Sequence, residues 1–139
     1  MKFIHLSSLT LNEIIKYSIK IYETTKYLEN DYPNYKKWFI EKQLKEVLEG
    51  RREILFLEEN NEIIALACLK KEENKICTLY VKEEYRNKGI GTELINSVDN
   101  PNIYLWVYKN NKRAISLYEK LGFTNVEETD TRYKMKKTK

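Results

Sequence analysis

The chain has 139 residues, of which 42% are hydrophobic and 33% charged, with only four glycines and two prolines. This balance excludes the collagen-like, low-complexity and disordered classes, and a chain of this length buries a core without disulfide or metal support. No apolar run approaches the ~20 residues needed to cross a bilayer, and the first residues lack the apolar segment of a signal peptide. We therefore expect a single cytoplasmic domain over residues 1–139.

The formal net charge of +4, the single histidine and the two cysteines limit the kinds of binding and catalytic site that the chain can form. The positive excess lies in the lysine-rich end at residues 134–139, which indicates a solvated tail rather than a nucleic-acid surface. A tetrahedral Cys/His zinc site cannot be assembled from the single histidine, His5, without a Cys-x-x-Cys pair, so we expect no metal. A catalytic triad would have to use His5 as its base, and we do not expect one. Cys68 and Cys77 lie in apolar runs, and we predict that both are buried, unreactive free thiols.

The first half of the chain predicts a strand, two helices and a hairpin. A short strand is expected at residues 2–6, and Thr10 to Glu13 fit a capping box that starts a helix over about 11–25. We expect its buried side to carry Ile14, Ile15, Ile19 and Tyr22. A polar, aromatic loop at 26–36 precedes a second helix that ends at Gly50. The apolar residues of this second helix are Ile40, Leu44, Val47 and Leu48.

The second half predicts strands first and then strands that alternate with helices. Strands are expected at 53–57, 63–69 and 76–81, joined by turns at 59–62 and 71–74. A helix over about 90–98, a strand at 103–108, a helix over 111–121 and two strands near 123–127 and 132–136 follow. The order β-α-α-β-β-β-α-β-α-β-β predicts an α/β fold with a mixed sheet. The core side of the 90–98 helix should carry Ile90, Leu94, Ile95 and Val98.

The most informative segment runs from Val81 to Thr92, where a strand ends, a basic loop follows and two glycines precede a helix. Converging backbone amides and a helix N-terminus favour an anion, and glycine lets that anion approach the backbone closely. The segment is not a P-loop, because no Gly-Lys-Ser/Thr follows, and it lacks the Rossmann glycine spacing.

Two motifs in this half resemble the GNAT acetyltransferase superfamily. Residues Arg86-Asn87-Lys88-Gly89-Ile90-Gly91 are similar to its pyrophosphate-binding loop, Arg/Gln-x-x-Gly-x-Gly/Ala. Residues 111–123 are similar to its second block, with Asn111 and Ala114 at its start, Tyr118 within it and Gly122-Phe123 at its end. The resemblance covers about residues 76–124 in motif and the earlier residues only in element order.

The resemblance implies a GNAT-like fold with a splayed central sheet and an N-acetyltransferase that uses acetyl-coenzyme A as co-substrate. Acetyl-coenzyme A would lie where the 76–81 strand diverges from the 103–108 strand, with the backbone of Leu79 and Val81 along its pantetheine arm and an amide near Val81 on the thioester oxygen. Tyr118 would be the general acid for the departing thiolate, because phenols and thiols have comparable pKa values. The residues assigned to coenzyme binding are Leu79, Tyr80, Val81, Arg86, Asn87, Lys88, Gly89, Ile90, Gly91, Thr92 and Asn111.

The sequence departs from the family where a general base is expected. Two protein-acetylating branches carry a glutamate at the positions of Trp106 or Lys75, and this chain has neither carboxylate. Tyr80, a glutamate at 83 or 84 acting through water, and bulk solvent all remain candidates for the base.

The amine acceptor is not identified by the sequence. The resemblance places its site at the loop 27–35 and the hairpin 127–131, whose acidic and tyrosine residues would attract an ammonium or form ordinary solvated loops. The alternative function is a coenzyme A-binding sensor or interaction module without turnover. We expect acetyl-coenzyme A and an amine as partners, and no membrane or nucleic acid, with a homodimer left open.

Overall fold

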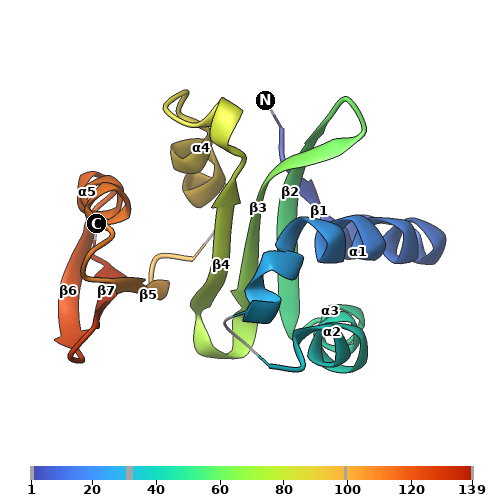
Figure 1. Ribbon diagram of the computed structural model, residues 1–139, viewed down its shortest axis with the longest axis horizontal. Helices are drawn as coiled ribbons and strands as arrows, with labels where there is room; N and C mark the ends of the chain where they lie inside the picture. The colour runs from blue at the N-terminus through green and yellow to red at the C-terminus, as the bar shows by residue number, and fades with distance from the viewer. Residues whose placement is uncertain (1, 31–32, 99, 139) are drawn as a thin grey trace.

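A computed structural model describes residues 2–30, 33–98 and 100–138, and in it the elements follow the predicted order. Seven strands form one mixed sheet in the order β1-β2-β3-β4-β5-β7-β6 (Figure 1). Neighbouring strands pair antiparallel except β4 and β5, which are parallel. The α/β mixed-sheet prediction is therefore confirmed. The strands are β1 (Ile4–His5), β2 (Arg52–Glu59), β3 (Glu62–Lys70), β4 (Lys75–Val81), β5 (Tyr104–Tyr108), β6 (Phe123–Glu128) and β7 (Arg132–Lys137).

Helix α1 (Leu11–Thr25) begins as predicted, but it buries a different face. Thr10 accepts a hydrogen bond from the Glu13 amide while the Glu13 carboxylate accepts one from the Thr10 amide, which completes the capping box. The buried residues are Ile14, Ser18, Ile21 and Thr25, whereas Ile15 and Ile19 are exposed and Tyr22 is half-buried. The polar face can be buried because the Thr25 hydroxyl donates to the Ile21 carbonyl oxygen and meets the Tyr35 hydroxyl at 2.6 Å.

The second predicted helix is divided into three parts: α2 (Tyr35–Trp38), a π-helical segment (Phe39–Gln43) and α3 (Leu44–Leu48). A π-helical turn adds a residue to each turn and rotates the following side chains about the axis. Ile40 and Leu48, predicted to be buried, are therefore exposed, while Phe39 and Val47 reach the core. The predicted loop at 26–36 begins as a 3-10 helix (Lys26–Asn30), and its residues 31–32 lie outside the described part.

Two hydrophobic clusters cover the two faces of the sheet. One includes residues from α1, α2, the π-helical segment and α3 packed on β2 and β3, as Ile21, Phe39 and Phe56 show. The other gathers the predicted core side of α4 (Ile90–Asn96), together with Tyr118 of α5 (Lys112–Lys120). Since strand side chains alternate between the faces, neighbouring residues such as Leu55 and Phe56 belong to different clusters.

Strands β4 and β5 touch at one end only, which confirms the predicted splay. Their one paired position is Lys75 with Tyr104, and the strands diverge beyond it (Figure 1). A bulge in β4 lies just past this point: Cys68 faces Thr78 and Leu69 faces Ile76, so Cys77 is the extra residue. The bulge leaves Cys77 exposed, and the prediction of two buried thiols is wrong for Cys77, while Cys68 is buried and both are free.

Across residues 2–30, 33–98 and 100–138, no helix is long and apolar enough to cross a membrane. In the same described ranges, no three His, Cys, Asp or Glu side chains gather in a way that could hold a metal ion.

Candidate functional site

The loop between β4 and α4 has the backbone shape that an anion-binding loop needs. A 3-10 turn (Glu83–Tyr85) follows β4, and the chain then passes through Asn87 and Gly89, both in the left-handed region at φ 64° and 80°. Gly89 is the N-cap of α4, and only glycine adopts that conformation without strain from a Cβ atom. The loop therefore turns sharply and presents its backbone in front of the first turn of α4.

The edge of β4 that faces away from β3 carries the backbone groups of Leu79 and Val81. The Lys82 amide donates to the Ile64 carbonyl oxygen at 2.8 Å. Because antiparallel ladders alternate, the peptide groups of Val81 and Leu79 point to the opposite edge, toward the splay. The Val81 carbonyl oxygen there accepts a hydrogen bond from Nε of Arg86 at 2.9 Å, which fixes that guanidinium beside the strand end.

A cleft of about 560 Å³ lies between this edge, the loop and α5. It is lined by eleven of the twelve residues that the sequence assigned to coenzyme binding or catalysis. Lys88 is the exception, because its ammonium lies over the Tyr85 ring, 5.5 Å from the centroid. The far wall is α5 rather than β5. The following lining residues were not among those assigned from the sequence, and most of them lie on α5 beside the motif residues: Tyr85, Arg113, Ala114, Ser116, Leu117 and Lys120.

The start of α5 is tied to the loop across the cleft. The Asn111 side-chain oxygen caps the helix by accepting from the Ala114 amide at 3.2 Å. The guanidinium of Arg113 donates to the side-chain oxygen of Asn87 at 2.9 Å. Asn111 therefore has a structural role as well as a place in the cleft, and Arg113 holds the two sides of the cleft together.

Tyr118 lies on α5 at the inner wall of the cleft and is only 7% exposed. Its ring packs against Phe123, with ring centroids 5.7 Å apart. Burial raises the pKa of the Tyr118 phenol to about 12, because a charged phenolate loses hydration in the interior. The hydroxyl is therefore protonated throughout the physiological pH range and can serve as a hydrogen-bond donor.

The carboxylate candidates for a general base stay outside the cleft. Glu83 and Glu84 are exposed and belong to the turn after β4. Glu84 pairs with Lys82, which also pairs with Glu62. Tyr80 lines the cleft and is the one candidate side chain that the structure brings to it.

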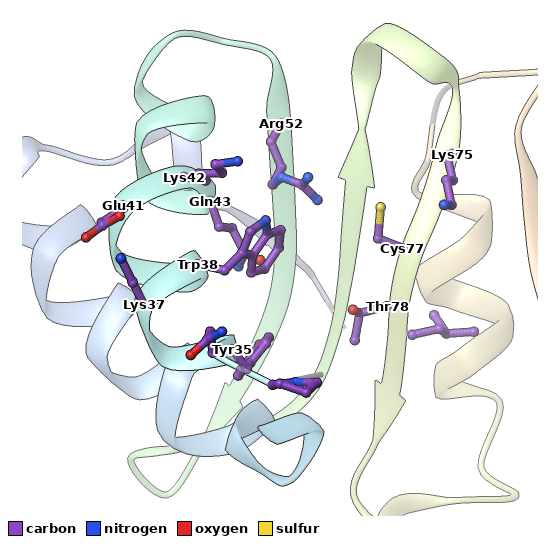
Figure 2. A pocket seen from close by; sticks show the side chains of 13 residues that line it. Tyr35, Lys37, Trp38, Glu41, Lys42, Gln43, Arg52, Lys75, Cys77 and Thr78 are labelled. Carbon is purple, nitrogen blue, oxygen red and sulfur yellow. The ribbon is translucent and has the colours of Figure 1, made fainter. Parts of the chain in front are cut away.

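A second, larger cavity of about 850 Å³ opens between the α2 and π-helical segment and β4 (Figure 2). Leu79 lines both cavities, so they meet at β4. Of the loop expected to hold the acceptor, Pro33, Asn34 and Tyr35 line this cavity, while residues 31–32 lie outside the described part. The hairpin 127–131 does not line this cavity. Its Glu127 pairs with Lys134 of β7, and its Glu128 pairs with Lys109, which follows the end of β5.

Comparison with known proteins gives a consistent family. The sequence pattern of the acetyltransferase (GNAT) family matches residues 14–123. Mycothiol acetyltransferase of Corynebacterium efficiens is 32% identical over 85 residues, 54% of this chain and 29% of that protein. N-alpha-acetyltransferase 50 of Danio rerio is 40% identical over 67 residues, 42% of this chain and 40% of that protein. The matches thus span less than half of either relative.

A solved structure supports the same fold over the whole chain. The PaiA N-acetyltransferase of Thermoplasma acidophilum, crystallised with coenzyme A, superposes with a TM-score of 0.68 over 99% of both chains. The two sequences are 22% identical, so this comparison establishes a shared fold and nothing about the substrate.

Proposed function

Because the chain belongs to the acetyltransferase (GNAT) family, we propose that it transfers the acetyl group of acetyl-coenzyme A to a primary amine of a small-molecule or peptidyl acceptor. The observation that carries this proposal is the cleft beside β4. Residues from a strand edge, a glycine loop and a helix, assigned separately by motif, line that one cleft.

In this proposal the coenzyme arm lies along the free edge of β4, and its pyrophosphate lies against the loop 86–91. The outward peptide group of Leu79 hydrogen-bonds the pantetheine arm as an added strand would, and that of Val81 lies further along the same edge with its amide toward the thioester. The loop amides and the Arg86 guanidinium hold the phosphate oxygens by charge-assisted hydrogen bonds. The Asn111 side chain, beyond its cap, reaches the same arm from α5.

The transfer proceeds by direct attack. The amine nitrogen attacks the thioester carbon to form an N–C bond, and the Val81 amide stabilises the developing oxyanion. The C–S bond then breaks and its electron pair leaves on sulfur. The Tyr118 hydroxyl donates a hydrogen bond to this thiolate, while the proton lost by the amine passes to water, directly or by way of Tyr80. The products are the N-acetylated amine and free coenzyme A.

Two measurements test the proposal. Calorimetric titration should give acetyl-coenzyme A binding at one site per chain, and release of the free coenzyme thiol should follow on addition of amines from a panel. Binding without thiol release across a panel of amino acids, polyamines, phosphoamines and peptides would instead favour the coenzyme-binding sensor. Absence of coenzyme binding would refute both.

A further inference from the structure

The cavity between α2, the π-helical segment and β4 has a lining unlike that of the coenzyme cleft. Its volume of about 850 Å³ lies within the range of small-molecule sites. The Trp38 ring of α2 forms part of its wall, and Leu79 of β4 lines it although the Leu79 side chain packs on the α4 face of the sheet. Leu79 also lines the cleft proposed for acetyl-coenzyme A, so the two spaces adjoin at β4, two residues from Val81.

The charged side chains of this cavity are mostly positive. Figure 2 shows Lys42 and Arg52 extending toward β4, with Lys75 on the facing strand, while Glu41 points away from β4. Within the described residues, Lys42 and Lys75 form no ion pair with a carboxylate. Lys42 and Lys75 therefore contribute positive charge that no carboxylate of the described residues pairs with, whereas Arg52 is paired with Glu46.

Arg52 places a buried cation at the base of this face. It is 3% exposed, and its Nε and Nη2 each lie 3.2 Å from the Glu46 carboxylate. Its Nη1 donates to the Cys68 sulfur at 3.2 Å, Cys77 is a second sulfur partner of the guanidinium, and a thiol is a weak acceptor. A guanidinium has five N–H donors in a planar fork, so Arg52 retains donor capacity for an oxyanion.

Gln43 adds a second buried donor. Its side chain lines the cavity, is 5% exposed, and has no hydrogen-bond partner among the described residues. No fully buried side-chain nitrogen or oxygen of the described residues lacks a hydrogen bond, so the Gln43 amide is open to the cavity and can bind a polar group there. An oxyanion in this cavity would accept hydrogen bonds from Gln43 and Arg52.

We propose that this cavity binds the acceptor of the acetyl transfer by an anionic group, so that the acceptor is a small amine that also carries a carboxylate or phosphate. The inference rests on the proposed function and specifies its substrate class. Arg52 and Gln43 bind the oxyanion, Lys42 and Lys75 attract it, and the amine end lies at Leu79 beside the thioester. This replaces the acidic acceptor walls expected from the sequence with a basic one.

The same lining assists the attack. Positive charges near an ammonium disfavour its charged form, so the neutral amine that attacks the thioester is easier to reach. This effect reduces the demand for a carboxylate base, which the coenzyme cleft lacks.

Matched pairs of acceptors give the direct test. Thiol release should have a higher kcat/KM for tyrosine than for tyramine, for β-alanine than for propylamine, and for O-phosphoethanolamine than for ethanolamine, by at least about tenfold in one pair. A preference confined to the first two pairs identifies a carboxylate, and one confined to the third identifies a phosphate. Equal values within all three pairs would overturn the inference while leaving the proposed function intact.

Charge variants connect the preference to this cavity. Lys42→Ala and Lys75→Ala should each lower kcat/KM for the anionic member by about two- to fivefold, and together by about tenfold, with a clearly smaller loss for the plain amine. Lys36→Ala is the matched control, because Lys36 is exposed on the same helix but lies outside the cavity lining. Equal losses for both members of a pair would refute the role of these lysines.

Alkylation of Cys77 provides a readout that does not require turnover. Cys77 is exposed and lines the cavity, whereas burial raises the pKa of Cys68 to about 12 and leaves it unreactive. The preferred anionic amine should slow iodoacetamide labelling of Cys77, its plain partner should not, and Cys77→Ser should remove the labelled site. If no acetyl transfer occurs, protection by an anionic amine alone still supports the cavity's selectivity, and equal labelling with both refutes it.

Discussion

Replacing Tyr118 with phenylalanine separates a hydrogen-bond donor from a core residue. The ring is 7% exposed and packs on Phe123, so the packing surface is kept and only the hydroxyl is lost. Since no described residue receives a hydrogen bond from that hydroxyl, its removal leaves no partner unsatisfied. The variant should therefore fold, with an unfolding free energy within about 0.5 kcal/mol of the wild type at pH 7.

The magnitude of the rate effect follows from the raised pKa. A phenol of pKa about 12 is a weaker acid than a thiol of about 8.5, so full proton transfer to the thiolate is uphill by roughly 5 kcal/mol. The sequence-based expectation of matched pKa values is therefore replaced by hydrogen-bond stabilisation of the leaving thiolate. Hydrogen bonds to charged groups contribute about 1.5–3 kcal/mol, so kcat should fall about 10- to 150-fold.

The assay is single-turnover acetyl transfer, with coenzyme affinity measured separately by calorimetry. We expect the rate to fall while the Kd for acetyl-coenzyme A stays within about twofold, because only the transition state places charge on sulfur. A wild-type rate in Tyr118→Phe, with chemistry limiting, would refute the donor role. A loss of affinity equal to the loss of rate would indicate that Tyr118 only packs against the coenzyme.

The same variant tests the buried phenol through alkaline stability. The folded-state pKa of Tyr118 is raised above its usual value of 10.0, so its contribution to stability is fully present below pH 10 and is lost as the pH rises toward 12. The loss is at most about 2.7 kcal/mol. Denaturant titrations at pH 8 and pH 11.5 should show a smaller alkaline loss for Tyr118→Phe than for the wild type, and identical losses would contradict the raised pKa.

Three further predictions test other parts of the chain. Gly91→Val should weaken acetyl-coenzyme A binding at least about tenfold in calorimetry. Gly91→Ala should bind acetyl-coenzyme A nearly normally, because its Cβ atom would lie 3.4 Å from Leu117 Cδ2, which is close to ordinary van der Waals contact. If Gly91→Val bound acetyl-coenzyme A as tightly as the wild type, a close approach of the coenzyme to the Gly91 backbone would be excluded. Thr10→Ala should lower the unfolding free energy by about 1 kcal/mol with kcat unchanged, and no loss in a denaturant titration would contradict the capping box. In native protein, iodoacetamide should label Cys77 and spare Cys68 by mass spectrometry, whereas equal labelling would contradict the burial of Cys68.

The sequence alone determined the features that depend on neighbouring residues. The capping box at Thr10 was predicted and is found, and the left-handed Gly89 before α4 and the Asn111 cap of α5 are likewise set within a few residues, although neither was predicted from the sequence. Hydrophobic periodicity and turn signals predicted the order of the elements, and the two motifs identified most residues that line the cleft beside β4, because strand, loop and helix follow one another directly along the chain.

Tertiary structure decided which surfaces face each other. Helix α1 carries two stripes of comparable hydrophobic character, and the sheet selected the one with Ile14 and Ile21, because Thr25 could be satisfied by Tyr35. The β4 bulge turned Cys77 out of the core. The positive cavity combines Arg52 of β2 with side chains of the π-helical segment and β4, and contacts between segments so far apart in sequence follow only from the packing of the sheet and helices, which no local pattern records.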